Sequence, residues 1–181
     1  MSSARFAILS VAALCLAAIH TSGAAQTSPS GPLSDAALEQ VAIGRMLDAR
    51  AGFFAGIQLD VIGGDALLTG RVRSLQDKGR ASALVRSVPG IQTVINEIHV
   101  GGADDVKRIA ADLLIERQVR TAMHEAFGAQ MPKLAWRATN GVVYVFGQAK
   151  TEWEHNRALA VAKLQGVAQV VDHLRIVPNG G

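Results

Sequence analysis

The chain has 181 residues, a formal net charge of +3 and a single cysteine, Cys15. Lys and Arg number 18 against 15 Asp and Glu, a balance that does not suggest the clustered basic face of a nucleic-acid-binding protein. One cysteine also excludes a disulfide framework and a thiolate metal site. Aromatic residues are few, and Trp136, Tyr144 and Trp153 all fall in the C-terminal half.

Residues 1–25 have the pattern of a secretory signal peptide. Arg5 is the only early charge, an apolar run follows from Phe6 to Ile19, and small residues occupy positions 22–25. The run is shorter than the roughly 20 residues that span a bilayer. We expect cleavage after Ala24 or Ala25 and a mature protein outside the cytoplasm.

Cys15 lies inside this apolar run and raises the alternative of a lipoprotein signal. Such a signal has a small residue directly before the modified cysteine, whereas Leu14 is not small. We therefore expect no lipid anchor, and a mature chain without thiols.

The remaining sequence repeats itself at a constant shift. Asp35 aligns with Asp112, Gly70 with Gly147, and, after one deletion near Val88, Gly90 with Gly166. A shift that holds over roughly sixty-five residues indicates a duplicated module. The predicted organisation is a linker at 26–33, module one at 34–101, a linker or helical extension at 102–111, module two at 112–177, and a tail at 178–181.

Module one is predicted to begin with a helix. Ser34 or Asp35 can cap a helix that starts at Ala36, and the segment from Arg50 to Gly56, which contains two glycines, ends it. Helical spacing gives this helix one apolar face, formed by Leu38, Val41, Ala42 and Met46.

The rest of module one reads as two strands, a helix and a third strand. Apolar residues alternate from Ile57 to Val61, Gly63-Gly64-Asp65 suits a hairpin turn, and 66–72 is the return strand. Ser74 caps the next helix, Pro89-Gly90 stops it, and 91–100 is the third strand. The buried stripe of that helix is expected to be Ala81, Leu84, Val85 and Val88.

Module two repeats this order. Asn140-Gly141 favours a type I′ turn between strands 134–139 and 142–147. Thr151 and Glu154 form a capping box for the following helix. Gly166 is expected to end that helix, and 167–177 is the last strand. Trp136 should face the helices, while Trp153 could lie in the core or on the surface.

The helix predicted over 104–127 carries two stripes of side chains at 100° per residue. The stripe that matches the repeat, and should face the core, is Ile115, Val119, Ala122 and Ala126. The other stripe is Ile109, Leu113, Arg117, Arg120, His124 and Phe127.

These modules resemble the BON domain. The resemblance rests on Gly70, Gly90 and Val94-Ile95-Asn96 in module one, and on Gly147, Gly166 and Val170-Val171-Asp172 in module two. Module two departs from the pattern at Phe146 and at Gln148-Ala149-Lys150. The resemblance implies an α+β fold, with two helices on one face of a three-stranded mixed sheet in each αββαβ module. It also implies a non-catalytic periplasmic protein that binds phospholipid or envelope components and supports envelope integrity and stress tolerance.

No catalytic pattern accompanies the repeat. The histidines have no partners at metal-ligand spacing, and no Gly-x-Ser-x-Gly elbow is present. Gly63-Gly64 joins two strands and does not precede a helix, which excludes a phosphate loop. We expect no enzyme activity, no metal and no cofactor. The four glycines at positions 70, 90, 147 and 166 are expected to be structural.

The candidate binding surface is the second stripe of the 104–127 helix together with its basic neighbours. A mixed basic and apolar helix face suits an anionic membrane surface. The alternative is that this face packs against module one, and Asp112 and Glu116 on its flank weaken the membrane interpretation. The predicted lipid or partner residues are Lys107, Arg108, Ile109, Leu113, Arg117, Arg120 and Phe127.

Two functions therefore stay open. The first is a phospholipid-binding envelope protein that uses module two. The second is a protein-interaction or chaperone module for envelope assembly, which would use the open face and the edge strands of its sheets. Binding to anionic and neutral vesicles distinguishes the two.

Overall fold

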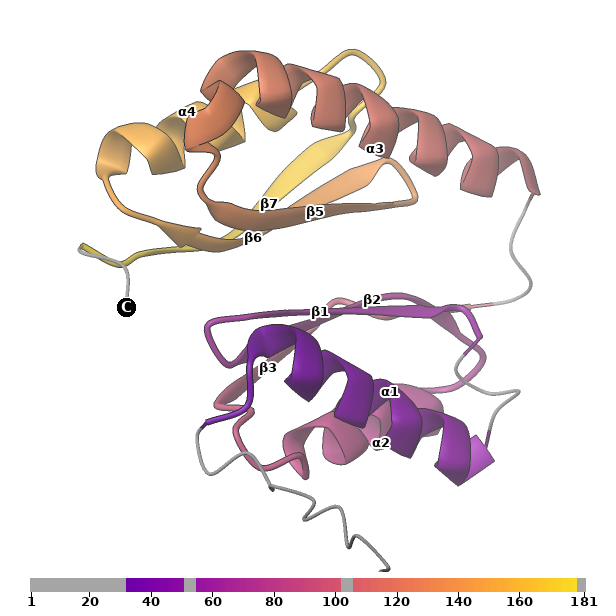
Figure 1. Cartoon of the computed structure of the whole chain (residues 1–181). Coiled ribbons are helices and arrows are strands. Elements are labelled where there is room, and N and C mark those ends of the chain that lie inside the picture. Colours follow the sequence, from indigo (N-terminus) through magenta and orange to yellow (C-terminus); the bar gives the residue numbers. More distant parts are fainter. Residues whose placement is uncertain (1–31, 51–54, 102–105, 179–181) are drawn as a thin grey trace, which may run out of the picture. The chain divides into compact units, whose positions relative to one another are not determined.

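The computed structural model describes residues 32–50, 55–101 and 106–178. Within these residues the order helix, strand, strand, helix, strand occurs twice (Figure 1). The predicted signal peptide, Cys15, nearly all of the linker before module one and residues 102–105 lie outside the described residues. The α+β fold with two mixed sheets that the sequence predicts is confirmed.

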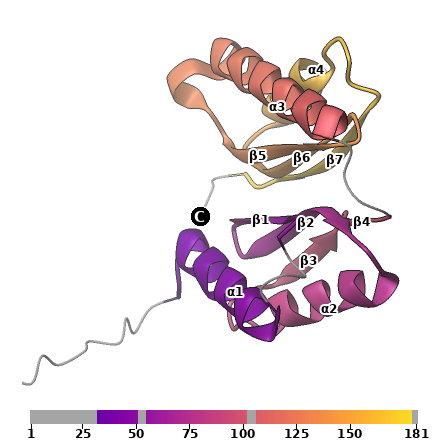
Figure 2. The same ribbon diagram turned by 90° about the vertical axis from the view of Figure 1, so that its right-hand side faces the viewer.

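Module one consists of α1 (Asp35–Arg50), β1 (Ile57–Ile62), β2 (Asp65–Val72), α2 (Leu75–Arg86), β3 (Thr93–Asn96) and β4 (His99–Val100). Strand β2 is central: β1 pairs with it antiparallel, and β3 and β4 pair with it in parallel. Figures 1 and 2 show α1 and α2 on the same face of this sheet. Ser74 caps α2 as predicted, because its hydroxyl accepts a hydrogen bond from the backbone nitrogen of Asp77 at 3.1 Å.

The third strand of module one is interrupted, whereas the sequence predicts a single strand over 91–100. The Asn96 side chain accepts a hydrogen bond from the backbone nitrogen of Ile98 at 3.1 Å. This local bond competes with the strand ladder. Ile98 is thereby turned into the core, where it is 1% exposed.

The core of module one lies between the helices and the sheet. Leu38, Ala42 and Met46 are buried, as predicted, but Val41 is 39% exposed and the prediction for it was wrong. Leu38, Ala42 and Met46 are spaced four residues apart and form one row along the helix. Val41 lies outside that row. Ile43 packs against the core from the other side of the row.

Module two consists of α3 (Val106–Phe127), a 3-10 turn η1 (Gly128–Gln130), β5 (Lys133–Thr139), β6 (Val142–Ala149), α4 (Glu152–Ala162) and β7 (Gln169–Ile176). β6 is central, with β5 antiparallel and β7 parallel to it. The Asn140-Gly141 turn is confirmed, with φ of 55° and 76°. Helices α3 and α4 lie on the same face of the sheet (Figure 1).

Both ends of α4 differ in detail from the prediction. Thr151 caps the helix through a 3.1 Å bond from the Glu154 backbone nitrogen. The Glu154 carboxylate, however, accepts from the backbone nitrogen of Lys150 at 2.6 Å, one residue before the position that a capping box uses. The helix ends at Ala162, before Gly166, because Lys163 already leaves the helical conformation (ψ 75°).

Gly70 and Gly147 sit at equivalent positions near the ends of the central strands, with φ of 99° and 131°. A Cβ on Gly70 would lie 2.0 Å from the Gly56 carbonyl oxygen, and one on Gly147 would lie 2.3 Å from that of Lys133. These contacts leave no room for a side chain. Both glycines therefore lie where the chain passes close to its own backbone.

The faces of the two sheets that carry no helices meet each other. Leu67, Tyr144 and Phe146 form one buried cluster that contains residues of both modules. The second function, as stated from the sequence, uses these open sheet faces for a partner. That part of the prediction was wrong, because in this chain each face is covered by the other module.

Candidate functional site

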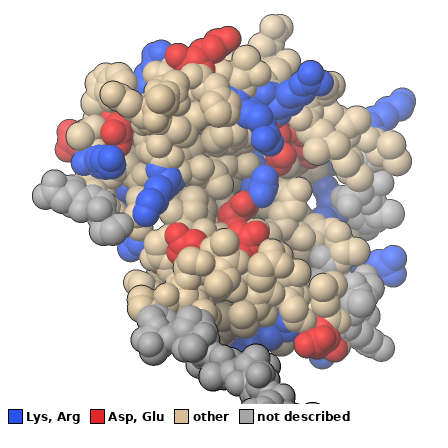
Figure 3. Space-filling model, viewed as in Figure 1, with Lys and Arg blue, Asp and Glu red and all other residues tan. Residues whose placement is uncertain are grey.

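The candidate site is formed by the exposed side of α3. Val106, Ile109, Leu113 and Leu114 are 78%, 43%, 58% and 59% exposed. Monomeric soluble proteins seldom leave several large apolar side chains exposed together on one helix unless a partner covers them. We call these four residues, together with the exposed Lys107, Arg108, Arg117 and Arg120, the α3 outer face. On the molecular surface, basic side chains along α3 are interspersed with acidic ones (Figure 3).

Phe127 does not belong to this face, and its predicted placement was wrong. It is 8% exposed and belongs to the module-two core. The buried row of α3 is Ile115, Val119, Met123 and Phe127, at intervals of four, whereas Ala126 only packs against that core. The Phe127 ring also packs edge-on against Trp153, with centroids 6.1 Å apart and planes at 81°.

Sequence reasoning missed two exposed apolar residues of α3, Val106 and Leu114. The duplicated module contains a signal for one of them. Leu113 and Leu114 align with Ala36 and Ala37 of α1, and Arg117 aligns with Gln40. Module one therefore builds the same helix with small or uncharged residues, so the fold does not require the α3 outer face.

The two acids beside the α3 outer face, Asp112 and Glu116, accept hydrogen bonds from the backbone of module two. Asp112 accepts hydrogen bonds from the backbone nitrogens of Asn140 (2.9 Å) and Gly141 (2.8 Å). Glu116 accepts from the backbone nitrogen of Ala138 at 2.8 Å. Both carboxylates are thus turned toward the hairpin, which accounts for acids next to a basic and apolar surface.

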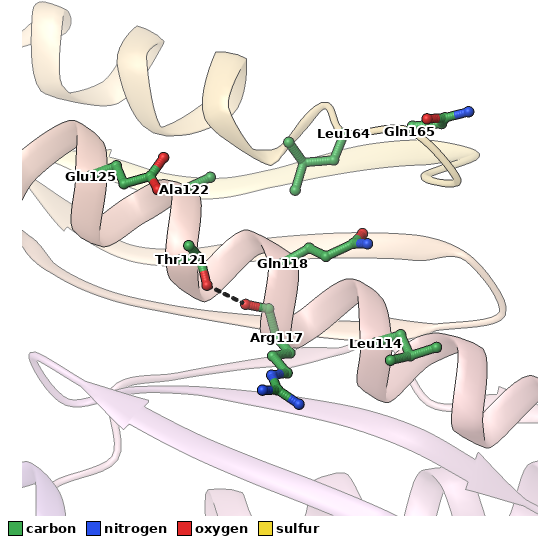
Figure 4. Close-up of a pocket in the computed structure, with 8 residues that line it drawn as sticks. All are labelled: Leu114, Arg117, Gln118, Thr121, Ala122, Glu125, Leu164 and Gln165. Atoms are coloured by element: carbon green, nitrogen blue, oxygen red, sulfur yellow. Dashed lines mark hydrogen bonds between the residues drawn. The ribbon is translucent and has the colours of Figure 1, made fainter.

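A groove of about 560 Å³ runs along one flank of α3. Leu114, Ala122 and Leu164 supply its apolar lining, and Gln118, Thr121 and Glu125 add polar groups. In Figure 4, Leu164 reaches toward α3 from the segment after α4, and Arg117 extends away from Leu164. The Thr121 hydroxyl is bonded to the Arg117 carbonyl oxygen at 3.3 Å, so it is occupied within the helix.

The opposite flank of α3 approaches module one. Ile109 and Leu113 line a smaller cavity of about 260 Å³ together with Gly56, Gly70 and other residues of both modules. Both side chains nevertheless remain exposed. The two side chains thus border module one while staying exposed, and the alternative that this face packs against module one stays a prediction.

Trp136 faces the helices as predicted. Its side chain packs against the module-two core, and its indole nitrogen donates to the Glu116 carbonyl oxygen at 3.1 Å. Trp153 lies on the surface and is 65% exposed. The ambiguity that the sequence left for Trp153 is thus resolved.

The histidines are held in pairwise contacts. His155 lies 2.9 Å from Asp172, and His173 lies 2.9 Å from Glu97. His99 lies 2.9 Å from the Tyr144 hydroxyl, and burial is the main reason that the pKa of His99 is lowered, with Arg71 and Lys78 adding to the effect. Within the described part of the chain, no three His, Cys, Asp or Glu side chains gather as a metal site requires.

None of the helices in residues 32–50, 55–101 and 106–178 has the length and apolar character that a membrane span requires.

The sequence model of the BON domain matches residues 34–102 and 111–178. The chain is 31% identical over 128 residues to a protein of Anaplasma centrale named for the gshII 5′ region, covering 69% of this chain and 84% of that protein. It is 29% identical over 109 residues to the outer membrane lipoprotein DolP of Haemophilus influenzae. That match covers 60% of this chain and 56% of DolP, so the chain spans little more than half of that relative. A solved structure of CdsD, a structural protein of the type III secretion system of Chlamydia trachomatis, aligns with a TM-score of 0.32 and 11% identity over 75% of this chain and 92% of that one.

Proposed function

The chain belongs to the BON domain family, and on that premise we propose that it is an exported, non-catalytic envelope protein that binds anionic phospholipid through the α3 outer face. The observation that carries the proposal is the group of exposed apolar side chains, Val106, Ile109, Leu113 and Leu114, flanked by basic residues on one helix. Module one lacks this group at the aligned positions. The name of the DolP relative, an outer membrane lipoprotein, supports an envelope setting.

The magnitudes require both the basic and the apolar residues. A basic residue near an anionic leaflet contributes about 1 kcal/mol, so four contribute roughly 4 kcal/mol. That corresponds only to millimolar binding. Insertion of Leu113 and Leu114 would add about 1.5–3 kcal/mol each, which brings binding toward the micromolar range before the cost of association is subtracted.

The proposed location is the periplasm, with residues 1–25 acting as the signal peptide. Because Leu14 precedes Cys15, the mature chain would carry no lipid and would depend on α3 for membrane contact. There it would support envelope integrity and stress tolerance. Mass spectrometry of the protein from the envelope fraction tests this: a chain that begins near Ala25 without lipid is expected, and a diacylglyceryl adduct on Cys15 would contradict it.

The decisive variant transfers the residues of module one onto α3. Leu113→Ala, Leu114→Ala and Arg117→Gln introduce the residues that α1 carries at the aligned positions. We expect wild-type protein to float with phosphatidylglycerol vesicles and not with phosphatidylcholine vesicles, and the triple variant to float with neither. The thermal unfolding of the triple variant should match that of wild type, because all three side chains are exposed.

The matched control is Leu47→Ala, which removes an exposed leucine (52%) from α1. It should leave flotation unchanged, because α1 lies outside the proposed surface. Wild-type protein that ignored anionic vesicles at low salt would overturn the proposal. The groove beside Leu114 and Leu164 would then favour the second candidate, a protein-interaction module that binds a partner through α3 and the sheet edges.

A further inference from the structure

The contacts between the two sheets have a symmetry that follows from the duplication. Asp60 and Arg137 are equivalent positions: Asp60 lies opposite Leu67 in the first hairpin, and Arg137 lies opposite Tyr144 in the second. These two equivalent residues pair with each other. The Arg137 guanidinium donates to both Asp60 oxygens, at 2.8 and 2.6 Å.

A second pair repeats the relationship at the other edge of the sheets. Asn96 and Asp172 are equivalent, because each accepts a hydrogen bond from the backbone nitrogen two residues later, at 3.1 and 2.9 Å. The residues that follow them, Glu97 and His173, are therefore equivalent as well. They pair with each other at 2.9 Å.

A third relationship joins different positions reciprocally. The Arg71 side chain donates to Asn140. The residues aligned with these two are Gln148 and Gly63, and the Gln148 amide lies so close to Gly63 that a Cβ there would be 2.0 Å from it. Contacts in which i meets j and j meets i define an isologous, two-fold interface. The two modules thus pair as a dimer contained in one chain.

The charges on this interface are not symmetric. Three pairs across it have the acid in module one and the basic side chain in module two: Asp60 faces Arg137, Glu97 faces His173, and Asp65 faces Arg175 at 2.5 Å. The one base that module one adds in these contacts, Arg71, meets the neutral Asn140. In a pair of two module-one sheets, the same geometry would place Asp60 against Asp60 and Glu97 against Glu97. Two module-two sheets would place Arg137 against Arg137. Like charges held together away from water are strongly unfavourable.

We propose that the two sheet faces form a charge-coded recognition surface, in which the sheet of module one binds the sheet of module two, from the same chain or a second copy, and rejects its own kind. The apolar centre, Leu67 against Tyr144 and Phe146, supplies area and no selectivity. The flanking ion pairs supply the selectivity. The Asp60 side chain is only 13% exposed, so its pairing is shielded from salt.

Tyr144 is the single tyrosine of the sequence and is 3% exposed at the centre of this interface. Its rate of nitration therefore reports opening of the interface in the full chain. Asp60→Arg and Arg137→Asp should each raise that rate by about tenfold or more, which corresponds to about 1.4 kcal/mol of lost pairing. The double variant restores an opposite-charge pair and should return the rate to within about twofold of wild type. Asp48→Arg, a charge reversal at an exposed site of α1, should leave the rate unchanged.

Mixing the two single variants tests recognition between copies. In the Asp60→Arg variant positions 60 and 137 are both basic, and in the Arg137→Asp variant both are acidic. Neither variant offers itself an opposite charge, so each alone should be a monomer in sedimentation. An equimolar mixture offers both complementary pairs and should form a one-to-one dimer. A double variant as reactive as the single variants would overturn the charge code. A mixture that stays monomeric would overturn recognition between copies.

Discussion

The carboxylate of Asp112 lies 2.8 Å from the backbone nitrogen of Gly141, a residue on a hairpin 29 positions later. Asp35 has the same relationship with Gly64 in module one, at 3.0 Å. In each module an aspartate of the first helix is fastened by hydrogen bonds to the turn of the hairpin, from the first turn of α1 in module one and from a position further inside α3 in module two. The fastening fixes where α3 lies on its sheet, and hence which of its side chains face outward.

Loss of the Asp112 carboxylate should destabilise module two. Asp112→Ala leaves two backbone N–H groups without their acceptor, at a cost of about 1–3 kcal/mol. Urea unfolding followed by tryptophan fluorescence measures the change, because both tryptophans lie in module two. Asp48→Ala, at an exposed acid of α1, is the control and should unfold like wild type. Equal midpoints for Asp112→Ala and wild type would show that the two bonds contribute nothing.

Gly147 and Gly79 should respond to alanine in opposite directions. At Gly147 a Cβ would lie 2.3 Å from the Lys133 carbonyl oxygen in a left-handed backbone conformation, so Gly147→Ala should cost at least about 1–3 kcal/mol. Gly79 lies in α2 with nothing within 4 Å of its Cβ position. Gly79→Ala should stabilise the protein by about 0.5–1 kcal/mol. Thermal unfolding of both variants checks the pair, and a tolerated Gly147→Ala would refute the close approach.

His99 should make the protein less stable in mild acid. Burial chiefly, and then Arg71 and Lys78, lower the pKa of His99 below its ordinary value of 6.5. As the pH falls through 6.5, the unfolded chain binds a proton that the folded chain does not, so the free energy of unfolding decreases. His99→Gln removes this proton uptake and should lose less stability between about pH 7 and pH 5.5, near the titration range of histidine.

Urea midpoints at several pH values measure the effect of His99. The partly buried acids Asp60 and Glu39 act in the opposite sense, because loss of solvent around each carboxylate raises its pKa. Their protonation stabilises the folded state as the pH falls further, so the comparison is best confined to the histidine range. Parallel pH profiles for wild type and His99→Gln would contradict the assignment.

Charge reversal on α3 should remove vesicle binding without unfolding the protein. Arg117→Glu with Arg120→Glu replaces attraction to an anionic leaflet by repulsion, at exposed positions. Binding of wild type to phosphatidylglycerol vesicles should also weaken as salt is raised. Ile115→Ala with Val119→Ala, at positions that are 7% and 0% exposed, should instead lower the unfolding temperature, since each large-to-small change in a core costs about 1–5 kcal/mol. Flotation of the Glu variant at wild-type levels would exclude these arginines from the site.

Much of the fold could be predicted because local signals and the repeat agreed. Asn140-Gly141 specified its turn, Ser74 and Thr151 specified helix starts, and the aligned glycines marked where the chain approaches itself. Phe127 was misplaced because its helix is apolar on two sides, and spacing alone did not choose between the rows that contain Ala126 and Phe127. Leu114 was missed for the same reason.

The pairing of the sheets could not be predicted from periodicity. Asp60 alternates with Leu59 and Val61, which is the pattern of a strand with one side in water. Its actual neighbour, Arg137, becomes visible only when the two modules are placed face to face. A polar residue on an alternating strand can thus face either solvent or a complementary charge, and the local pattern is the same for both.

The pairing of Asp60 with its own counterpart also constrains how the chain can change. In a symmetric dimer of separate subunits, one substitution alters both sides of such a contact at once, so the position must be compatible with itself. In this chain the two sides of the contact are encoded by separate codons, so position 137 could acquire a charge opposite to that of Asp60. For the same reason, a charge-changing mutation at either position breaks the opposite-charge pair until a second mutation at the other position restores it. Positions 60 and 137 should therefore vary together among proteins that share this arrangement, with the sign of the charge free to exchange between the halves.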